Sequence, residues 1–324
     1  MLGRTAAGHR RADLRPLAPA DIGGDSVHER DRLCGRIAGV EFHRTSVFGA
    51  VRLSGVTSTL KPVTLITGAS SGIGAAFARV FAQHGHELVL VARRQAQLDA
   101  VADAIAAGDR RRPHVLSLDL GRSGAAAVIA RELTARGLEP AIVVNNAGFG
   151  LFGFAEELDF QRQLAMIDLD VRLLTDLSLR FVETMARHRG GLLNVASLAS
   201  FFPGPRMAVY FACKAYVLSF TEALHQEFAP RGVKVAAFCP GPLRTEFFAR
   251  AGIAKGGLPR MFTGSPERAA RTAYDGFMRG RCLIVPGAVD KILAAAPRFL
   301  PRSWLLSIMA AIGANLLVDP PENS

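Results

Sequence analysis

The sequence has 324 residues, 49% of them hydrophobic, and its 39 Lys and Arg exceed its 28 Asp and Glu to give a formal charge of +11. This is a globular composition with core material for one large domain or two smaller ones. Nearly all the positive charge is arginine, spread over the first 60 residues and short runs rather than clustered, which argues against a nucleic-acid partner. The four cysteines are far apart in the sequence, which argues against a metal site or a disulfide framework and suits a reducing cytosol: Cys34, Cys213, Cys239 and Cys282.

Residues 1–60 mix Arg, Gly, Asp and His without a sustained apolar period, and they lack the apolar run of a secretory signal. We expect them to be a tail, either disordered or the product of a start assigned too far upstream, with the functional chain beginning near Pro62. Residues 61–288 are the predicted main domain and residues 289–324 an apolar extension.

From residue 62 onward, short apolar runs alternate with amphipathic stretches. The pattern predicts strands at 62–67, 86–92, 114–120, 141–148, 192–197 and 233–241. It predicts helices at 72–85, 96–108, 125–137, 157–188 and 209–229. Apolar strands separated by helices indicate a parallel sheet covered on both faces, which is a doubly wound α/β domain of the Rossmann type. Ligands of such sheets bind at the carboxyl ends of the strands.

The end of the first predicted strand carries "TGASSGIG", residues 67–74. Glycines at 68, 72 and 74 permit a tight turn and let backbone N–H groups and a helix N-terminus approach a pyrophosphate. The second strand ends at Arg93 and Arg94, where an NAD-selective fold usually has an acid. An arginine can pair with a 2′-phosphate, which favours NADP, although two solvated surface arginines would give the same pattern.

Two further strand ends fit the same ligand. Asp119 in "LDL" is placed to bond an adenine amino group, and the small residues of "NNAG", 145–148, leave room for a cofactor beside the strand. The complete predicted cofactor set adds neighbours of these motifs and residues discussed below: Gly68, Ser70, Ser71, Gly72, Ile73, Gly74, Arg93, Arg94, Asp119, Leu120, Asn146, Ala147, Gly148, Tyr210, Lys214, Pro240, Gly241 and Thr245.

A tyrosine and a lysine lie one helical turn apart in "VYFACKAY", residues 209–216. On a helix Tyr210 and Lys214 share one face. A neighbouring ammonium lowers the pKa of a phenol, which turns the tyrosine into a usable proton donor and acceptor. Alone, the spacing is also that of an ordinary helix in which Tyr210 packs and Lys214 reaches solvent.

Taken together, "TGASSGIG", "NNAG", the serine of "NVASLAS", "VYFACK" and "PGPLRT" occur in an order that resembles the short-chain dehydrogenase/reductase family, over about residues 62–285. The resemblance implies an NADP-preferring oxidoreductase that interconverts a carbonyl and an alcohol. Tyr210 would be the general acid or base, Lys214 would hold the nicotinamide ribose, and Ser197 would bind the substrate oxygen. Pro240, Gly241 and Thr245 would border the carboxamide. The family also suggests a homodimer or homotetramer.

One position departs from the family pattern. The family commonly has an asparagine where this chain has Asp170, in "MIDLDV". A carboxylate there would stabilise the Lys214 ammonium but oppose ionisation of Tyr210. We therefore expect a working enzyme with a raised pH optimum or a reduced rate, with Asp170 counted among the catalytic residues.

The substrate region is rich in large apolar residues, which serve either as a lid over an apolar substrate or as core anchors: Phe149, Phe152, Phe154, Phe247, Phe248, Met261 and Phe262. The apolar stretch within residues 290–318 is shorter than a spanning helix and can cover the pocket, pack on another subunit or lie in a membrane interface. The expected location is cytoplasmic, with or without membrane association. The alternative function is an NADP(H)-sensing regulator of the same fold without turnover.

Overall fold

The computed structural model describes residues 59–253 and 263–315. The chain divides into two units, residues 1–56 and 57–324, and all described residues belong to the second. Residues 1–58 of the predicted tail and the anchors Met261 and Phe262 therefore lie outside the described residues.

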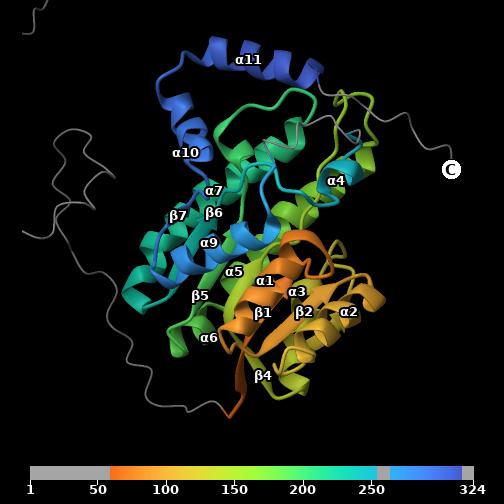
Figure 1. Cartoon of the computed structure of the whole chain (residues 1–324), viewed down its shortest axis with the longest axis vertical. Helices are drawn as coiled ribbons and strands as arrows, with labels where there is room; N and C mark the ends of the chain where they lie inside the picture. Colours follow the sequence, from red (N-terminus) through yellow and green to blue (C-terminus); the bar gives the residue numbers. More distant parts are fainter. Residues whose placement is uncertain (1–58, 254–262, 316–324) are drawn as a thin grey trace, which may run out of the picture. The chain divides into compact units, whose positions relative to one another are not determined.

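A seven-stranded parallel sheet forms the centre of the described part (Figure 1). Its strand order is β3-β2-β1-β4-β5-β6-β7, which confirms the predicted doubly wound Rossmann fold. The strands are β1 (Lys61–Thr67), β2 (Leu88–Ala92), β3 (His114–Ser117), β4 (Leu138–Asn145), β5 (Gly191–Val195), β6 (Lys234–Phe238) and β7 (Leu283–Ile284).

Helices cover both faces of this sheet because its central strands are apolar on both sides. Successive side chains of a strand point to opposite faces, so Leu65 and Ile66 of β1 enter different core clusters. The cluster with Ile66 holds α1 (Gly72–Gln83), α2 (Gln95–Ala106) and α9 (Pro266–Met278) against the sheet. The cluster with Leu65 holds α3 (Ala125–Ala135), α5 (Leu174–Arg180), α6 (Val182–Arg187) and α7 (Ala208–Phe228).

The helix predicted as continuous over 157–188 is instead interrupted. The structure has α4 (Phe160–Ile167), a π-helical turn η1 (Asp168–Leu173), then α5 and α6. A π turn contains an extra residue, and such turns are frequent at functional sites. Here the turn carries Asp170, whose side chain is fully buried, so the irregular segment coincides with a predicted catalytic residue. Sequence periodicity missed it because one extra residue leaves the apolar pattern helical.

Short elements follow β5, α7 and β6. They are, in that order, the 3-10 turn η2 (Leu198–Phe201), the 3-10 turn η3 (Ala229–Arg231) and the helix α8 (Phe247–Arg250). After β7 the chain forms α10 (Ala288–Ala295), the 3-10 turn η5 (Ala296–Arg298) and α11 (Arg302–Asn315), which rise beyond the sheet at the top of Figure 1. Within residues 59–253 and 263–315, none of the helices combines the length and the apolar character needed to cross a bilayer.

Candidate active site

The glycine-rich turn between β1 and α1 has the tight geometry that a pyrophosphate site requires. Gly68 and Gly72 have φ of 66° and 57°, in the left-handed region where side chains are strained. A Cβ at Gly74 would lie 2.3 Å from the carbonyl oxygen of Gly68. The turn therefore needs glycine at these three positions, and it leaves the backbone open at the N-terminus of α1.

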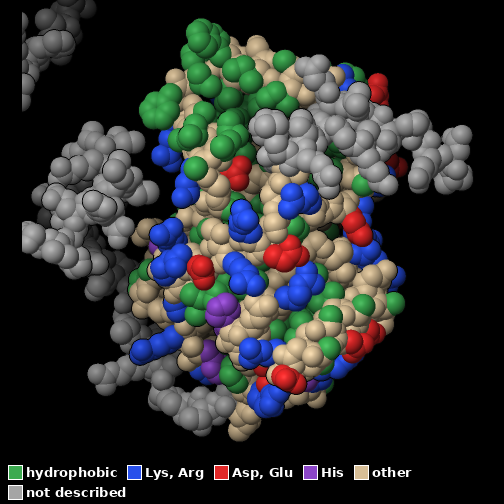
Figure 2. All heavy atoms as spheres, viewed as in Figure 1, with side chains coloured by type: hydrophobic (Ala, Val, Ile, Leu, Met, Phe, Trp, Pro, Cys, Tyr) green, Lys and Arg blue, Asp and Glu red, His purple; other side chains and the backbone are tan. Residues whose placement is uncertain are grey.

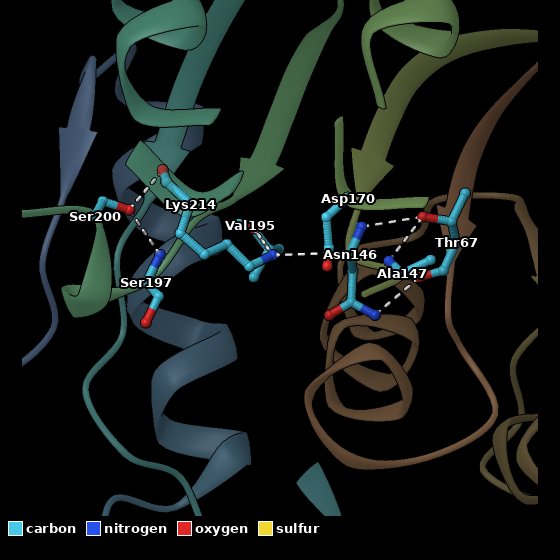
Figure 3. Close-up of polar contacts among 8 residues, drawn as sticks. All are labelled: Thr67, Asn146, Ala147, Asp170, Val195, Ser197, Ser200 and Lys214. Carbon is cyan, nitrogen blue, oxygen red and sulfur yellow. Dashed lines mark hydrogen bonds and ion pairs between the residues drawn. The ribbon is translucent and has the colours of Figure 1, made fainter. Parts of the chain in front are cut away.

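The "NNAG" segment after β4 is tied to this turn by a hydrogen-bond network that Figure 3 shows. The backbone N–H groups of Asn146 and Ala147 each donate to Thr67 Oγ1 at 3.0 Å. The Asn146 side-chain amide donates to the carbonyl oxygens of Thr67 at 2.8 Å and Gly68 at 3.2 Å. Thr67 and Asn146 thus fix the spacing between two strand ends. The role of Thr67 was not predicted, although it is the first residue of the quoted motif.

Lys214 and Asp170 form an ion pair in the interior. Lys214 Nζ lies 3.2 Å from Asp170 Oδ1 and donates a second hydrogen bond, also 3.2 Å, to the carbonyl oxygen of Val195 (Figure 3). The two side chains are only 6% and 0% exposed. The alternative in which Lys214 reaches solvent is therefore wrong. Within the described residues, Asp170 Oδ2 has no hydrogen-bond partner.

Tyr210 lies one turn before Lys214 on α7, with its ring centroid 5.7 Å from Lys214 Nζ. Ser197, at the start of η2 after β5, lies close enough to Tyr210 for its hydroxyl to lower the pKa of the phenol. Ser200 Oγ donates to the backbone carbonyl of Lys214 at 2.8 Å and so joins η2 to α7. Ser197, Tyr210, Lys214 and Asp170 come from three separate segments, and the structure brings all four close together.

The pKa directions around this group follow from burial and charge. Burial raises the pKa of the Tyr210 phenol, and Asp170 adds to the rise, whereas Lys214 and the Ser197 hydroxyl lower it. The net direction is upward, so the expected lowering by Lys214 is present but is outweighed by desolvation. Burial also raises the pKa of Asp170 against the pull of Lys214. Burial lowers the pKa of Lys214, but the charges of Asp170 and Tyr210 outweigh it, and the net direction is upward.

Gly148, the last residue of "NNAG", makes room for this ion pair. A Cβ at this position would lie 2.1 Å from Asp170 Oδ1 and 3.3 Å from Lys214 Nζ. The sequence predicts Gly148 as a cofactor residue; what the structure shows is that glycine is needed here because only a hydrogen atom fits beside the carboxylate.

The two arginines after β2 differ in their surroundings. Arg94 donates from Nη2 to the hydroxyls of Ser70 and Ser71, at 3.1 and 2.8 Å, and its Nη1 lies 3.6 Å from Glu246 Oε2. Arg93 is exposed. Only Arg94 is thus joined to the glycine-rich turn.

The other predicted cofactor residues border the same strand ends. Asp119 Oδ1 accepts from the backbone N–H of Gly121 at 3.1 Å, and Thr245 would be 3.2 Å from a Cβ at Gly72. Ile73 packs on the core, and Leu120 is buried in it. Pro240 accepts a backbone hydrogen bond from Leu198, and Gly241 lies against Asp290. No group of three His, Cys, Asp or Glu side chains in the described parts of the chain is arranged to hold a metal.

A pocket beside Tyr210 is lined mainly by apolar side chains. Its lining is Leu151, Gly153, Phe154, Ala155, Leu158, Gln163, Met166, Arg206, Met207, Ala208, Val209 and Tyr210. Arg206 has a φ of 66° and places its guanidinium 4.4 Å from the centroid of the Phe154 ring. Among the predicted aromatics, Phe152 is buried, and the Phe247 ring is 5.3 Å from that of Tyr210. Phe152 is thus a core anchor, whereas Phe154 lines the pocket.

The sequence also matches a known protein family. The family model described as short chain dehydrogenase matches residues 62–255. The chain belongs to the short-chain dehydrogenase family. It is therefore an oxidoreductase of that family, as the motif order predicted.

Relatives and solved structures show how far the likeness extends. The chain is 34% identical over 191 residues to sulfoacetaldehyde reductase 2 of Chromohalobacter salexigens, covering 58% of this chain and 75% of that protein. It is 29% identical to the human very-long-chain 3-oxoacyl-CoA reductase, covering 89% of this chain and 92% of the relative. A short-chain dehydrogenase from Sphingobium yanoikuyae, solved in complex with NADPH, superposes with a TM-score of 0.65 at 30% identity, covering 81% of this chain and 99% of that one.

Proposed function

We propose that this protein is an NADP(H)-dependent oxidoreductase that interconverts a carbonyl and an alcohol on a small or apolar substrate, with Tyr210 as general acid and base. The observation that carries the proposal is the convergence of Tyr210, Ser197 and Lys214. Lys214 lies beside the "NNAG" segment, which is hydrogen-bonded to the glycine-rich turn, and Tyr210 also lines an apolar pocket. A nucleotide pyrophosphate suits this turn, because three glycines leave its backbone uncovered.

Each polar side chain has a distinct task in carbonyl reduction. The Tyr210 hydroxyl donates its proton to the substrate oxygen, and Ser197 hydrogen-bonds the same oxygen while negative charge develops on it. The Lys214 ammonium stabilises the resulting phenolate, and Asp170 holds that ammonium in place. When bound, the nicotinamide supplies the hydride for reduction or accepts it in oxidation.

Arg94 supports a preference for NADP over NAD. Its guanidinium is held at the edge of the glycine-rich turn by the hydroxyls of Ser70 and Ser71. Arginine forms strong, directional hydrogen bonds with phosphate oxygens, and no acid occupies the position after β2 that usually binds a ribose hydroxyl. The solved NADPH complex of the Sphingobium yanoikuyae protein is consistent with this choice.

The pocket supports an apolar substrate. Its walls are chiefly aliphatic and aromatic, so an apolar ketone, aldehyde or acyl group would gain by leaving water there. Two similar proteins are named for a long-chain acyl or a bulky ketone substrate. One is the human very-long-chain 3-oxoacyl-CoA reductase. The other is a bulky-bulky ketone specific alcohol dehydrogenase from Comamonas testosteroni, with a TM-score of 0.61 at 28% identity, covering 79% of this chain and 94% of that one. We extend that substrate class to this chain as part of the proposal.

A homo-oligomer belongs to the same proposal. Leu179 on α5 and Tyr216 on α7 are 48% and 38% exposed. Tyr216 shares a hydrogen bond of 2.9 Å with Thr175 of α5, which places the two helices side by side at the surface. Light scattering of the purified protein would give the subunit number, and a monomer at all concentrations would contradict this part.

The central test is a spectrophotometric assay of NADPH and NADH oxidation with ketones, aldehydes and 3-oxoacyl thioesters. We expect turnover with at least one carbonyl class and a higher kcat/KM for NADPH. Tyr210→Phe removes the proton donor while keeping the ring, and it should lower kcat by about 10²–10⁴-fold, the usual contribution of a general acid.

The matched control is Tyr216→Phe, the same change at an exposed tyrosine on the same helix. It removes the hydrogen bond to Thr175 at the proposed subunit surface but no group of the active site, so turnover per subunit should be unchanged. Binding of NADPH without oxidation by any carbonyl, together with no effect of Tyr210→Phe on any measured property, would replace the enzyme by an NADP(H)-sensing regulator.

A further inference from the structure

A concentrated apolar surface covers the last helices of the described chain. Figure 2 shows hydrophobic side chains gathered over α10 and α11 at the top of the view. Of the fifteen large apolar side chains that are exposed in the described residues, eight lie between 289 and 312. They are Val289, Ile292, Leu293, Phe299, Trp304, Leu306, Ile308 and Ile312, and we call them the C-terminal apolar face.

The helix α11 exposes an apolar side instead of a polar one. Its inward stripe consists of Leu305, which is buried, Met309, which is half-buried, and Gly313, which is buried. These positions repeat every four residues, as expected for one side of a helix. From residue 303 to the end of α11 no side chain is charged. A helix that packs on a protein surface normally exposes its polar side to water. The exposed apolar side of α11 is therefore expected to contact another apolar surface, such as a membrane or a protein.

The charged groups bordering this face are mainly cations. Lys291, Arg298 and Arg302 are exposed. The acid on α10, Asp290, points inward, because its carboxylate lies close to Gly241 and Gly287. Glu222 of α7 lies within electrostatic reach of Arg298, and it is the acid from the packed helix that opposes this positive border. An apolar face bordered by lysine and arginine matches the surface of a membrane that contains anionic lipids.

We propose that the C-terminal apolar face docks on an anionic lipid bilayer, with Trp304 and Phe299 entering the interfacial layer and Arg298 and Arg302 contacting lipid phosphates. Aromatic side chains favour that layer, and interfacial helices lie along the surface without crossing it. A second copy of the chain is a poorer occupant. A two-fold contact pairs the same patch of both copies, so it would bring two cationic borders into one interface.

Docking in this way places the substrate pocket near the lipid. A Cβ at Gly313 of α11 would lie 3.2 Å from the carbonyl oxygen of Pro205 and 3.9 Å from Cδ of Arg206, a residue of the pocket lining. The inward side of the helix that carries the docked face thus packs on the pocket rim, so the rim lies one helix away from the bilayer from which an apolar substrate would arrive. Lipid binding itself is independent of the proposed reaction and can be tested without turnover.

Trp304 is the single tryptophan of the chain, so its fluorescence reports on this face alone. The full-length protein is titrated with vesicles of phosphatidylcholine and phosphatidylserine in equal parts, and with vesicles of phosphatidylcholine alone. We expect a blue shift, and quenching by lipids brominated on the upper acyl chain, with the mixed vesicles. Binding should weaken as salt is raised, because the lipid attraction of the arginines is screened.

Two paired variants and one control locate the binding surface. Phe299→Ser with Ile308→Ser removes exposed apolar groups and should weaken vesicle binding about tenfold or more. Arg298→Gln with Arg302→Gln should weaken binding to the mixed vesicles about tenfold or more and leave the weaker binding to phosphatidylcholine unchanged. Met278→Ser, at an exposed apolar residue of α9, should leave both unchanged.

Three results would overturn the proposal. Unchanged vesicle binding by the Phe299→Ser, Ile308→Ser pair would assign the binding to another part of the chain, such as the arginine-rich residues 1–60. A blue shift of Trp304 fluorescence that grows with protein concentration in the absence of lipid would show that the C-terminal apolar face binds a second copy of the chain. Absence of any shift or quenching with mixed vesicles would exclude lipid docking. Circular dichroism of each variant confirms that the fold is intact.

Discussion

Replacing Gly148 by alanine tests whether the buried ion pair of Asp170 and Lys214 depends on the absence of a side chain after β4. The backbone of Gly148 is outside the left-handed region, so alanine can adopt its conformation. The added Cβ, however, would lie 2.1 Å from Asp170 Oδ1, a separation that real Cβ atoms do not show. The carboxylate must therefore retreat, and this takes it away from Lys214 Nζ or out of its rotamer.

The size of the effect follows from these distances. A retreat of about 1.3 Å or more is needed to restore an ordinary carbon–oxygen contact. Such a retreat would stretch the present 3.2 Å contact between Lys214 and Asp170 beyond hydrogen-bond range. Breaking a buried ion pair costs about 3–5 kcal/mol, because each charge is left without its partner. The lower entropy of the unfolded alanine chain offsets about 0.4–1 kcal/mol. The free energy of unfolding should therefore fall by about 2–5 kcal/mol.

Urea denaturation of Gly148→Ala would measure this loss, with Gly108→Ala as control. A Cβ at Gly108 would meet its nearest atom at 3.5 Å, an ordinary contact. In an Asp170→Ala protein, Gly148→Ala should lower the free energy of unfolding by less than about 1 kcal/mol. The oxygen with which the new Cβ would clash is then absent, so the effects of the two changes are not additive. Equal losses in both backgrounds would refute the reasoning, because the Cβ would then be clashing with something other than the carboxylate.

Three further predictions concern the proposed reaction. Arg94→Gln should lower kcat/KM for NADPH about tenfold to a hundredfold and leave that for NADH nearly unchanged, as expected for loss of a charged hydrogen bond, whereas Arg93→Gln should have the smaller effect. Asp170→Asn removes a charge that raises the pKa of Tyr210, so phenolate forms at lower pH and the rise of alcohol oxidation with pH should move to lower pH; an unmoved profile or the opposite shift contradicts the assignment. Ser197→Ala should lower kcat by about 10²–10³-fold with little change in KM, and an equal rise in KM instead would make Ser197 a binding residue.

The parallel α/β fold could be predicted from the sequence because the patterns that indicate it are local. Apolar strands such as β2, with all five residues buried, and glycines in the turn before α1 indicate a parallel sheet without knowledge of tertiary contacts. The π turn η1 and the short strand β7 were not predicted. One extra residue in a helix barely alters its apolar period, and two residues are too few to form a pattern.

The site was predictable in its residue types but not in its electrostatic balance. The spacing of Tyr210 and Lys214 indicated their common face, and the structure places them there. The net rise of the Tyr210 pKa could not be derived from spacing, because desolvation depends on how deeply segments distant in sequence enclose the phenol. Likewise, the hydrogen bond from Ser200 to the backbone of Lys214 depends on how η2 docks on α7.

The carboxylate of Asp170 connects three features that are independent in the sequence. The π turn carries its side chain into the interior, Gly148 leaves the space that it fills, and Lys214 supplies the opposite charge. The pairing of Lys214 with Asp170 has a consequence for Tyr210, since the two charges act on the phenol in opposite directions. Tyr210 therefore tends to keep its proton, the state from which a general acid acts, and the Asp170→Asn profile measures how much of that tendency Asp170 contributes.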